Sequence, residues 1–274
     1  MADGVMSLLF LPLSLFRPSL RRVSIVHGLD ITWSFSPYRF LLRRSLLSAH
    51  AIVAVSKFTL TLLHDLCRCS SSQTAVVIPC PLPITHGQPF KRTNPDTPTL
   101  LLLGRLVPRK GFVWFLQSVV PLLLSELPDL RVLIAGNGPY HSRIQQILSL
   151  SSLPSNVSLL GAVTQEEKCR LLSTSSLLVM PNIEKKDDPE GFGIVCIEAA
   201  HAGLPTVSAR LQGLQDAVTE GVTGYFFTPE SPQDCARVIL TALSHSWDSA
   251  SMMNEVRSCF DSDSIASRFV HEVF

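Results

Sequence analysis

Short apolar runs alternate with helix-like segments from about residue 99 to residue 244. The runs are rich in Leu, Val, Ile and Ala, and most of them end at a Gly, Pro or polar turn. Runs of this kind indicate strands that are buried on both faces. Alternation with short connections requires right-handed crossovers, which give a parallel sheet with helices on both sides. We therefore predict an α/β fold that binds its ligands at the carboxyl ends of the strands.

The predicted elements of this stretch follow one another closely. The strands are Thr99–Gly104, Leu130–Ala135, Val157–Leu160, Leu177–Met180, Pro205–Ser208 and Gly224–Phe227. The helices are Gly111–Leu127, a segment that ends at Leu150, Thr164–Ser173, Phe192–Ala202 and Pro232–Ser244. Thr164 and Glu167 have the spacing of a capping box, which supports a helix start there.

A shorter α/β piece precedes a proline-rich stretch. Six prolines between residues 79 and 98 indicate a linker. Before it, the predicted strands are Arg22–His27, Ala51–Ser56 and Thr74–Ile78, and the predicted helices are Arg39–Ser48 and Lys57–Cys67. We predict a partial Rossmann-like domain over residues 1–88, a second Rossmann-like domain over 89–250, and terminal helices over 251–274.

Composition and charge narrow the function classes. With 46% hydrophobic and 16% charged residues, the chain is not of the disordered class. Residues 1–110 hold 13 Lys and Arg against four Asp and Glu. This excess fits phosphate-bearing ligands or an anionic membrane surface, although Arg39, Arg43 and Arg44 fit an ordinary solvated helix face equally well. Seven cysteines without a C-x-x-C pair favour reduced thiols and a cytoplasmic location. No segment reaches the length of a membrane span.

Two glutamates flank the start of one predicted helix. Glu190 stands in the loop before it, and Glu198 lies eight positions further on. Gly191 and Gly193 would expose backbone N–H groups at the positive end of the helix, which favours a phosphate. Glu190 is expected to project and to accept hydrogen bonds from sugar hydroxyls, and Glu198 to bind a vicinal diol. The alternative is a helix-dipole partner and a surface charge.

A basic loop follows the first strand of the long stretch. Arg105 and Lys110 lie at the expected carboxyl end of that strand, and Gly111 allows the chain to turn into the next helix. Two cations at this position would neutralise a diphosphate. Basic loops are common, so this loop alone is weak evidence for a diphosphate site. Its combination with the glutamate motif makes the evidence strong.

Several other chemistries lack their motifs. Gly136-Asn137-Gly138 has no third glycine at the dinucleotide spacing, and no acidic residue follows about 20 residues on, which argues against a nicotinamide dehydrogenase. The chain has neither G-x-x-x-x-G-K-[ST] nor H-E-x-x-H, which argues against P-loop enzymes and zinc hydrolases. Its basic residues are not interleaved with aromatics, which argues against nucleic-acid binding.

The motifs together carry a family resemblance. G-R-x-x-x-x-K-G over Gly104–Gly111 and E-G-F-G-x-x-x-x-E-A over Glu190–Ala199 resemble the retaining GT-B glycosyltransferases of family 4, the glycosyl transferases group 1. The resemblance implies two Rossmann-like domains and transfer of a sugar from a nucleotide-diphosphate-sugar donor to a glycan, lipid or other glycoconjugate, without an obligatory metal or another cofactor. With the cytoplasmic location that the cysteines favour, peripheral contact with the inner face of a membrane through Arg39, Arg43 and Arg44 is a further hypothesis.

The resemblance also assigns roles to individual residues. Arg105 and Lys110 would hold the donor diphosphate, and Glu198 would bind the ribose. Glu190 would bind the sugar. The backbone of Gly191, Phe192 and Gly193 would lie near the sugar and the phosphate. His27, at the end of a predicted strand, would lie beside the anomeric centre, with Asp30 nearby on the acceptor side. Residues 251–274 would cross back to the N-terminal domain.

The sequence departs from the family at its start. The glycine-rich first loop is missing, and Ile78-Pro79-Cys80-Pro81 replaces the usual I-P-N-G. The resemblance therefore implies an N-terminally truncated member. The alternative to an active glycosyltransferase is a truncated, inactive remnant that binds a nucleotide. A nucleotide-sugar epimerase of the same architecture is a third option, against which the two glutamates and His27 argue.

Overall fold

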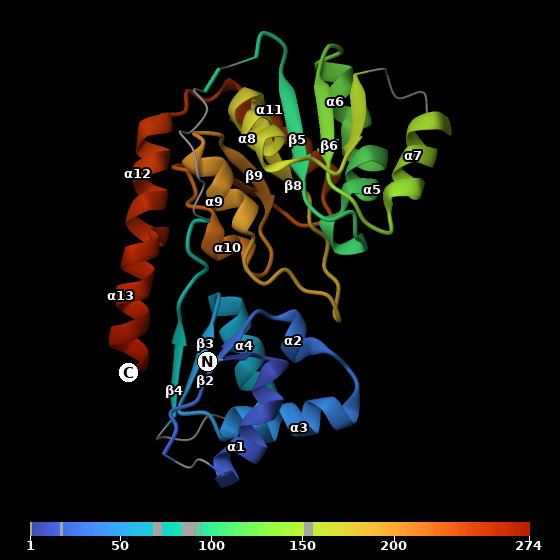
Figure 1. The fold of residues 1–274 in the computed structure, drawn as a ribbon. Helices are drawn as coiled ribbons and strands as arrows, with labels where there is room; N and C mark the ends of the chain where they lie inside the picture. The colour runs from blue at the N-terminus through green and yellow to red at the C-terminus, as the bar shows by residue number, and fades with distance from the viewer. Residues whose placement is uncertain (1, 17–18, 68–72, 84–91, 94, 151–155) are drawn as a thin grey trace.

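The computed structural model describes residues 2–16, 19–67, 73–83, 92–93, 95–150 and 156–274. These residues form two parallel sheets, one above the other in Figure 1. The predicted domain boundary at residue 88 lies outside the described residues. Both sheets confirm the predicted α/β class, since every strand pairing within them is parallel.

The N-terminal sheet has the strand order β1-β2-β3-β4. Its strands are β1 (Ala2–Asp3), β2 (Val23–Val26), β3 (Ala51–Ala54) and β4 (Thr74–Val77). The helices beside it are the 3₁₀ turn η1 (Met6–Leu9), α1 (Phe10–Phe16), α2 (Leu29–Thr32), α3 (Ser36–Leu47) and α4 (Lys57–Leu66). The three strands that the sequence predicts are confirmed, and β1 adds an edge strand that it did not predict.

The C-terminal sheet has the order β10-β9-β8-β5-β6-β7. Its strands are β5 (Thr99–Leu103), β6 (Arg131–Ala135), β7 (Val157–Gly161), β8 (Leu177–Met180), β9 (Thr206–Ala209) and β10 (Gly224–Phe227). The first helices are η2 (Pro108–Lys110), α5 (Phe112–Trp114), the π-helical η3 (Phe115–Val119), α6 (Val120–Glu126), α7 (His141–Leu150) and α8 (Gln165–Thr174). The later ones are α9 (Ile194–His201), α10 (Leu214–Ala217) and α11 (Pro232–Ser244).

Alternate residues of β5 supply two different cores. Leu100 and Leu102 pack with the helices α5, α6 and α11, and Leu101 and Leu103 pack with α8 and α9. All four side chains are buried, as a strand covered on both faces requires. The uninterrupted leucine run therefore defines the central strand of the sheet.

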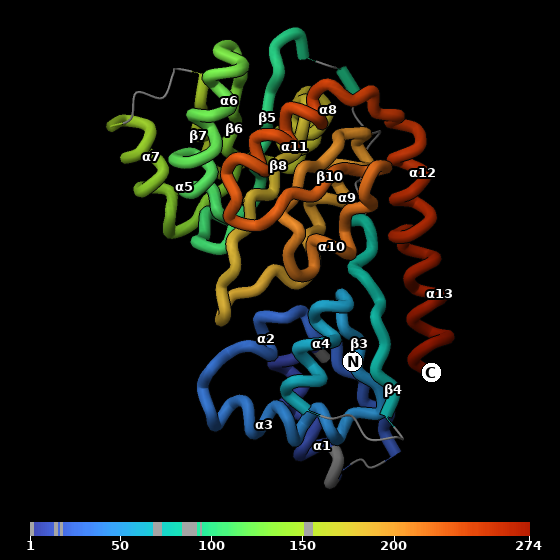
Figure 2. The backbone as a smooth tube through the Cα atoms, turned by 180° about the vertical axis from the view of Figure 1, so that it is seen from behind, coloured from blue at the N-terminus to red at the C-terminus, as the bar shows by residue number. Residues whose placement is uncertain are grey.

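Two terminal helices connect the sheets along one side of the molecule (Figure 2). α12 (Ser249–Phe260) packs on α9, and α13 (Ser262–Val273) places Ile265 in a cluster with Val23 and Val53 of the N-terminal sheet. The Arg268 guanidinium also donates to the Val77 carbonyl at 3.1 Å. The C-terminus thus returns to the N-terminal sheet, and α12 spans the expected boundary at residue 250.

Candidate active site

The strand order creates a switch point between β5 and β8. The chain runs from β5 to β6 and β7 on one side and returns to β8 on the other. Loops that leave such neighbouring strands diverge, and ligands of α/β sheets bind in the crevice between them. The loop after β5 carries residues 104–111, and the loop after β8 carries residues 181–193. The fold therefore brings the two predicted motifs to one place.

The two loops pack through backbone atoms. Gly111 has a left-handed backbone (φ +66°), and a Cβ atom there would overlap the Pro181 carbonyl. The Ile183 N–H group donates to the Arg109 carbonyl at 2.9 Å. The glycine that lets the chain turn into α5 is thus also required for the close approach of the loops.

Glu190 lies at the centre of a charged cluster. Its Oε2 atom is 2.6 Å from the Lys110 Nζ atom, accepts a hydrogen bond from Asn182 at 2.8 Å, and is paired with Arg109. The expectation that Glu190 projects from its loop is wrong, because these cations draw the carboxylate inward and leave the residue 8% exposed. Burial raises the pKa of Glu190, but Lys110 and Arg109 outweigh it and hold the pKa below its ordinary value.

Three residues of this cluster were not predicted from the sequence. Arg109 and Asn182 are buried, and the Asn182 Oδ1 atom has no hydrogen-bond partner among the described residues. Gln212 has an unusual positive φ of 49°, and its side-chain oxygen accepts the Glu190 N–H at 2.6 Å. Strained backbone and unpaired buried polar atoms concentrate at functional sites. The one sequence signal was the position of Asn182 directly after the strand β8.

Helix α9 begins two residues later than predicted. Gly193 is its N-cap and has a left-handed backbone (φ +94°). Phe192 is buried and packs edge-on against Phe260, with ring centroids 5.6 Å apart. This packing involves only the side chain of Phe192, and the predicted donor contact through its backbone stays a prediction.

Glu198 and Arg105 differ in their surroundings. The Glu198 carboxylate is 2.6 Å from the Nζ atom of Lys168 in α8, a residue to which no sequence motif pointed. Arg105 is exposed at the end of β5 and forms no ion pair with any described residue. The diphosphate role of Arg105 and the ribose role of Glu198 stay predictions.

The N-terminal sheet meets the Glu190 loop through its own carboxyl ends. The His27 carbonyl, directly after β2, lies so close to Gly191 that a Cβ atom there would overlap it. The Thr59 hydroxyl donates to the Gly191 carbonyl at 3.4 Å, and the Lys57 N–H group donates to Asp216 at 2.7 Å. His27 is exposed, and its carbonyl lies against Gly191 of the glutamate motif. Its place beside the anomeric centre stays a prediction.

Asp30 organises the turn that carries His27. Its carboxylate accepts the N–H groups of His27 at 3.0 Å and Gly28 at 2.8 Å. Burial raises the pKa of Asp30 above its ordinary value, although these contacts lower it. Asp30 and His27 line a cavity of about 470 Å³ together with Asp3, Val5, Leu29, Trp33 and Tyr38. The acceptor-side role of Asp30 stays a prediction, and its observed role is structural.

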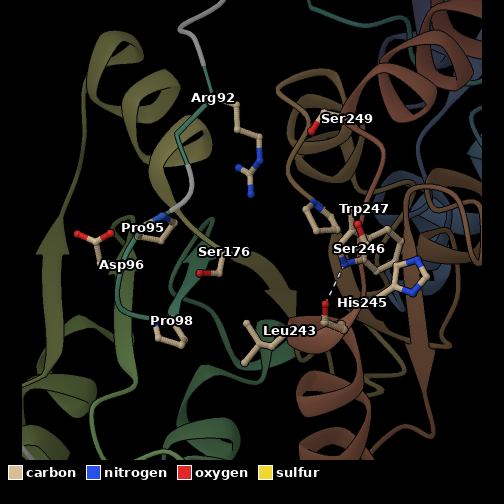
Figure 3. Close-up of a pocket in the computed structure, with 12 residues that line it drawn as sticks. Arg92, Pro95, Asp96, Pro98, Ser176, Leu243, His245, Ser246, Trp247 and Ser249 are labelled. Carbon is tan, nitrogen blue, oxygen red and sulfur yellow. Dashed lines mark hydrogen bonds between the residues drawn. The ribbon is translucent and has the colours of Figure 1, made fainter.

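A second cavity lies at the other end of the C-terminal sheet. It has a volume of about 520 Å³ and is bordered by Pro98, Ser176 and Pro205, which precede β5, β8 and β9. Figure 3 shows Arg92 extending between the surrounding segments. Burial lowers the pKa of Arg92. Because parallel sheets bind their ligands at the carboxyl ends, this cavity is separate from the candidate site.

The described residues offer neither a metal-binding cluster nor a membrane span. Within those ranges, no three His, Cys, Asp or Glu side chains gather where they could hold a metal ion. No helix in the described part of the chain has the length and apolar character to cross a membrane.

A family match decides which family the chain belongs to. Residues 87–257, more than half of the chain, match the family described as "Glycosyl transferases group 1". The chain belongs to this family. The match covers both motifs, Gly104–Gly111 and Glu190–Ala199, and it removes the dehydrogenase interpretation of Gly136-Asn137-Gly138.

Similar proteins include glycosyltransferases named for phosphatidylinositol acceptors. The chain is 29% identical over 231 residues to a GDP-mannose-dependent alpha-(1-6)-phosphatidylinositol monomannoside mannosyltransferase of Mycolicibacterium smegmatis. It is 32% identical over 156 residues to a phosphatidyl-myo-inositol mannosyltransferase of Propionibacterium freudenreichii. These matches cover 78% and 56% of the chain but only 60% and 37% of the relatives.

Solved structures confirm the GT-B type fold. Sucrose-phosphate synthase of Thermosynechococcus elongatus superposes with a TM-score of 0.75 at 20% identity, over 98% of the chain and 71% of that protein. Anabaena Alr3699/HepE in complex with UDP superposes with a TM-score of 0.76 at 18% identity, over 98% of the chain and 76% of that protein. Identities this low establish the architecture alone.

Proposed function

We propose that the chain is a retaining glycosyltransferase that moves a sugar from a nucleoside-diphosphate donor to an acceptor hydroxyl. The observation that carries the proposal is the charged cluster at the β5/β8 switch point, where Lys110 and Arg109 meet the buried carboxylate of Glu190. Family membership supports the reaction class. Relatives named for GDP-mannose and structures named for UDP support a nucleoside-diphosphate sugar as the donor class.

Each part of the cluster has a task in this proposal. Lys110 and the exposed Arg105 meet the diphosphate, and the N-terminus of α9 adds its backbone dipole. Glu190 binds the sugar hydroxyls. Glu198 binds the ribose, and Lys168 either leaves the Glu198 carboxylate or stays beside it as a further contact. His27 borders the sugar from the N-terminal sheet. Charge neutralisation by these cations is the reason for proposing that the transfer has no obligatory metal.

The proposed chemistry is substitution on one face of the sugar. The bond from the anomeric carbon to the diphosphate oxygen breaks, and the acceptor oxygen bonds to the same face of that carbon. The acceptor proton passes to the leaving phosphate oxygen. Lys110 stabilises the negative charge that develops on the diphosphate, and such electrostatic stabilisation is usually the largest catalytic contribution.

A nucleotide panel tests the proposal. UDP, GDP, ADP and their glucose or mannose conjugates are added to the wild type, Glu198→Ala and the surface control Glu126→Ala. At 100 times Kd, one nucleotide should raise the melting temperature by about 5 °C in the wild type and the control, but not in Glu198→Ala. No shift for any nucleotide would refute the donor site. Binding without release of nucleoside diphosphate from its sugar would favour the inactive-remnant alternative.

We further propose that the acceptor is lipid-linked and that α3 contacts the membrane that carries it. Arg39, Arg43 and Arg44 are exposed on α3, as are the apolar side chains of Phe40 and Leu41. A helix face that mixes cations with exposed apolar groups binds anionic lipid surfaces. Relatives named for phosphatidylinositol acceptors support this choice.

Vesicle binding should depend on these charges. The chain is expected to co-sediment with phosphatidylserine-containing vesicles at low salt and to lose about 1 kcal/mol of binding free energy per cation removed. Reversing Arg39, Arg43 and Arg44 to Glu should abolish sedimentation. The control reverses three exposed arginines of the other domain, Arg131, Arg143 and Arg170. It changes the net charge by the same amount and should leave co-sedimentation intact. Binding that is insensitive to salt and to the first reversal would refute the contact.

A further inference from the structure

Arg109 is a buried cation of the cluster to which the proposed donor binding gives no role. Its side chain is 8% exposed, and a buried arginine is rare unless it is paired. The Nε atom donates to the Asp188 carboxylate at 3.0 Å, and a terminal nitrogen pairs with the Glu190 carboxylate. One planar guanidinium therefore bridges two carboxylates of the loop after β8, a geometry that the point charge of a lysine does not reproduce.

The loop that carries these carboxylates has little regular structure of its own. Residues 184–193 form no helix or strand, so the conformation of Glu190 depends on contacts with other segments. Arg109 supplies such contacts from a rigid position, because it lies in η2 and its carbonyl accepts the Ile183 N–H. The residue thus anchors the loop through both its backbone and its side chain.

The charges of the cluster explain why Lys110 alone cannot serve both Glu190 and a donor phosphate. Lys110 and Arg109 share a single oxygen of Glu190. If Lys110 moves to an incoming phosphate, Glu190 loses one partner while it remains buried. A buried carboxylate without a partner is strongly destabilised. Arg109, held in turn by Asp188, can remain on Glu190 and satisfy its charge during that exchange.

We infer that Arg109 is a positioning residue for sugar transfer, which keeps Glu190 ionised and in place while Lys110 turns to the donor diphosphate. This inference rests on the proposed function, because it assigns Glu190 to the sugar. Arg109 itself touches no substrate in this arrangement. Its effect should therefore fall on the turnover step and on the titration of Glu190 more than on nucleotide binding.

The pH dependence follows from the groups that face Glu190. Lys110 and Arg109 approach it from the loop after β5, Asp188 lies behind Arg109, and Cys196 faces it from α9. The pKa of Glu190 is depressed, so the stabilisation that its ionised form gives is complete above the ordinary carboxyl pKa. This stabilisation is lost as pH falls through the folded-state pKa. Loss of Arg109 raises that pKa, so the loss begins at a higher pH.

Kinetics of Arg109 variants test the inference. UDP-glucose and GDP-mannose serve as probes, with release of nucleoside diphosphate as the readout, since transfer to water requires no known acceptor. In Arg109→Gln, kcat should fall about 10- to 100-fold while the affinity for UDP or GDP changes little. The acid limb of its kcat profile should move toward neutral pH. Arg109→Lys should restore the acid limb but only part of kcat.

Two further variants keep the test decisive. Arg237→Gln removes an exposed, ion-paired arginine of α11 and should match the wild type. Asp188→Asn removes one arm of the bridge at a partly exposed position, and it should lower kcat several-fold even if Arg109→Gln does not fold. If Asp188→Asn and the folded Arg109 variants keep the kcat and the acid limb of the wild type, the inference is overturned and the proposed function is not. A wild type that binds neither UDP nor GDP would overturn the proposed function as well.

Discussion

Lys110→Ala is expected to lower sugar transfer by a factor of about 10² to 10³, the cost of removing one electrostatic donor from a preorganised site. The Lys110 side chain is 8% exposed, and its Nζ atom lies 2.6 Å from Glu190. From this position the ammonium group is proposed to turn to a phosphate at the end of β5 while Arg109 stays paired with Glu190. The measurement is kcat and KM for release of nucleoside diphosphate from UDP-glucose or GDP-mannose.

The fold should survive the loss of Lys110. Arg109 and Asn182 remain on the Glu190 carboxylate, so its burial stays compensated. Lys186→Ala, in an exposed part of the same loop, is the matched control and should leave turnover unchanged. If Lys110→Ala turns over like the wild type, the assignment of this cluster to the diphosphate is wrong. A variant that failed to fold would show instead that Lys110 is chiefly a structural partner of Glu190.

Local sequence patterns were sufficient to predict the C-terminal sheet. Its six strands were expected within about two residues of their observed bounds, because each is an apolar run closed by a turn. The capping box of α8 is confirmed in both directions: the Thr164 hydroxyl accepts the Glu167 N–H at 3.2 Å, and the Glu167 carboxylate accepts the Thr164 N–H at 2.8 Å. These contacts span three residues, so the chain encodes them without tertiary help.

The sequence predicts terminal helices over residues 251–274, but weak periodicity left the separate bounds of α12 unpredicted. Its buried residues Met252, Val256 and Phe260 recur every four positions, but each turn carries only one of them. Polar residues fill the rest of Ser249–Phe260, which lowers its apolar contrast. The helix gains its stability by packing on α9, a tertiary contact that local sequence patterns do not include.

The orientation of the site residues depended on distant segments. The predicted motifs do meet, because the switch point between β5 and β8 follows from the strand order. The direction of Glu190 could not be predicted, since its partners Arg109 and Lys110 are about 80 residues away in the chain. The register of the loops that places them together is set by backbone contacts at Gly111 and Ile183, which leave no mark in residue pattern beyond a glycine.

Gly111→Ala should lower the free energy of unfolding by about 3 kcal/mol or more, from two additive causes. The backbone of Gly111 is left-handed (φ +66°), which costs an alanine about 1 to 2 kcal/mol. The added methyl group would also overlap the Pro181 carbonyl, which is backbone and has no rotamer to change. The loop after β8 must therefore move, and Glu190 and Asn182 move with it.

Gly161→Ala separates the two causes. Gly161 has a similar backbone (φ +73°), but among the described residues no atom lies within 4 Å of its added Cβ. It should lose only the conformational part, about 1 to 2 kcal/mol, and keep its nucleotide affinity. Urea unfolding of both variants, beside their Kd for UDP or GDP, makes the comparison. Equal losses of stability would mean that the contact between the loops carries no energy of its own. A larger loss in Gly111→Ala, together with weakened nucleotide binding, would mean that the packing of Gly111 on Pro181 sets the geometry of the charged cluster.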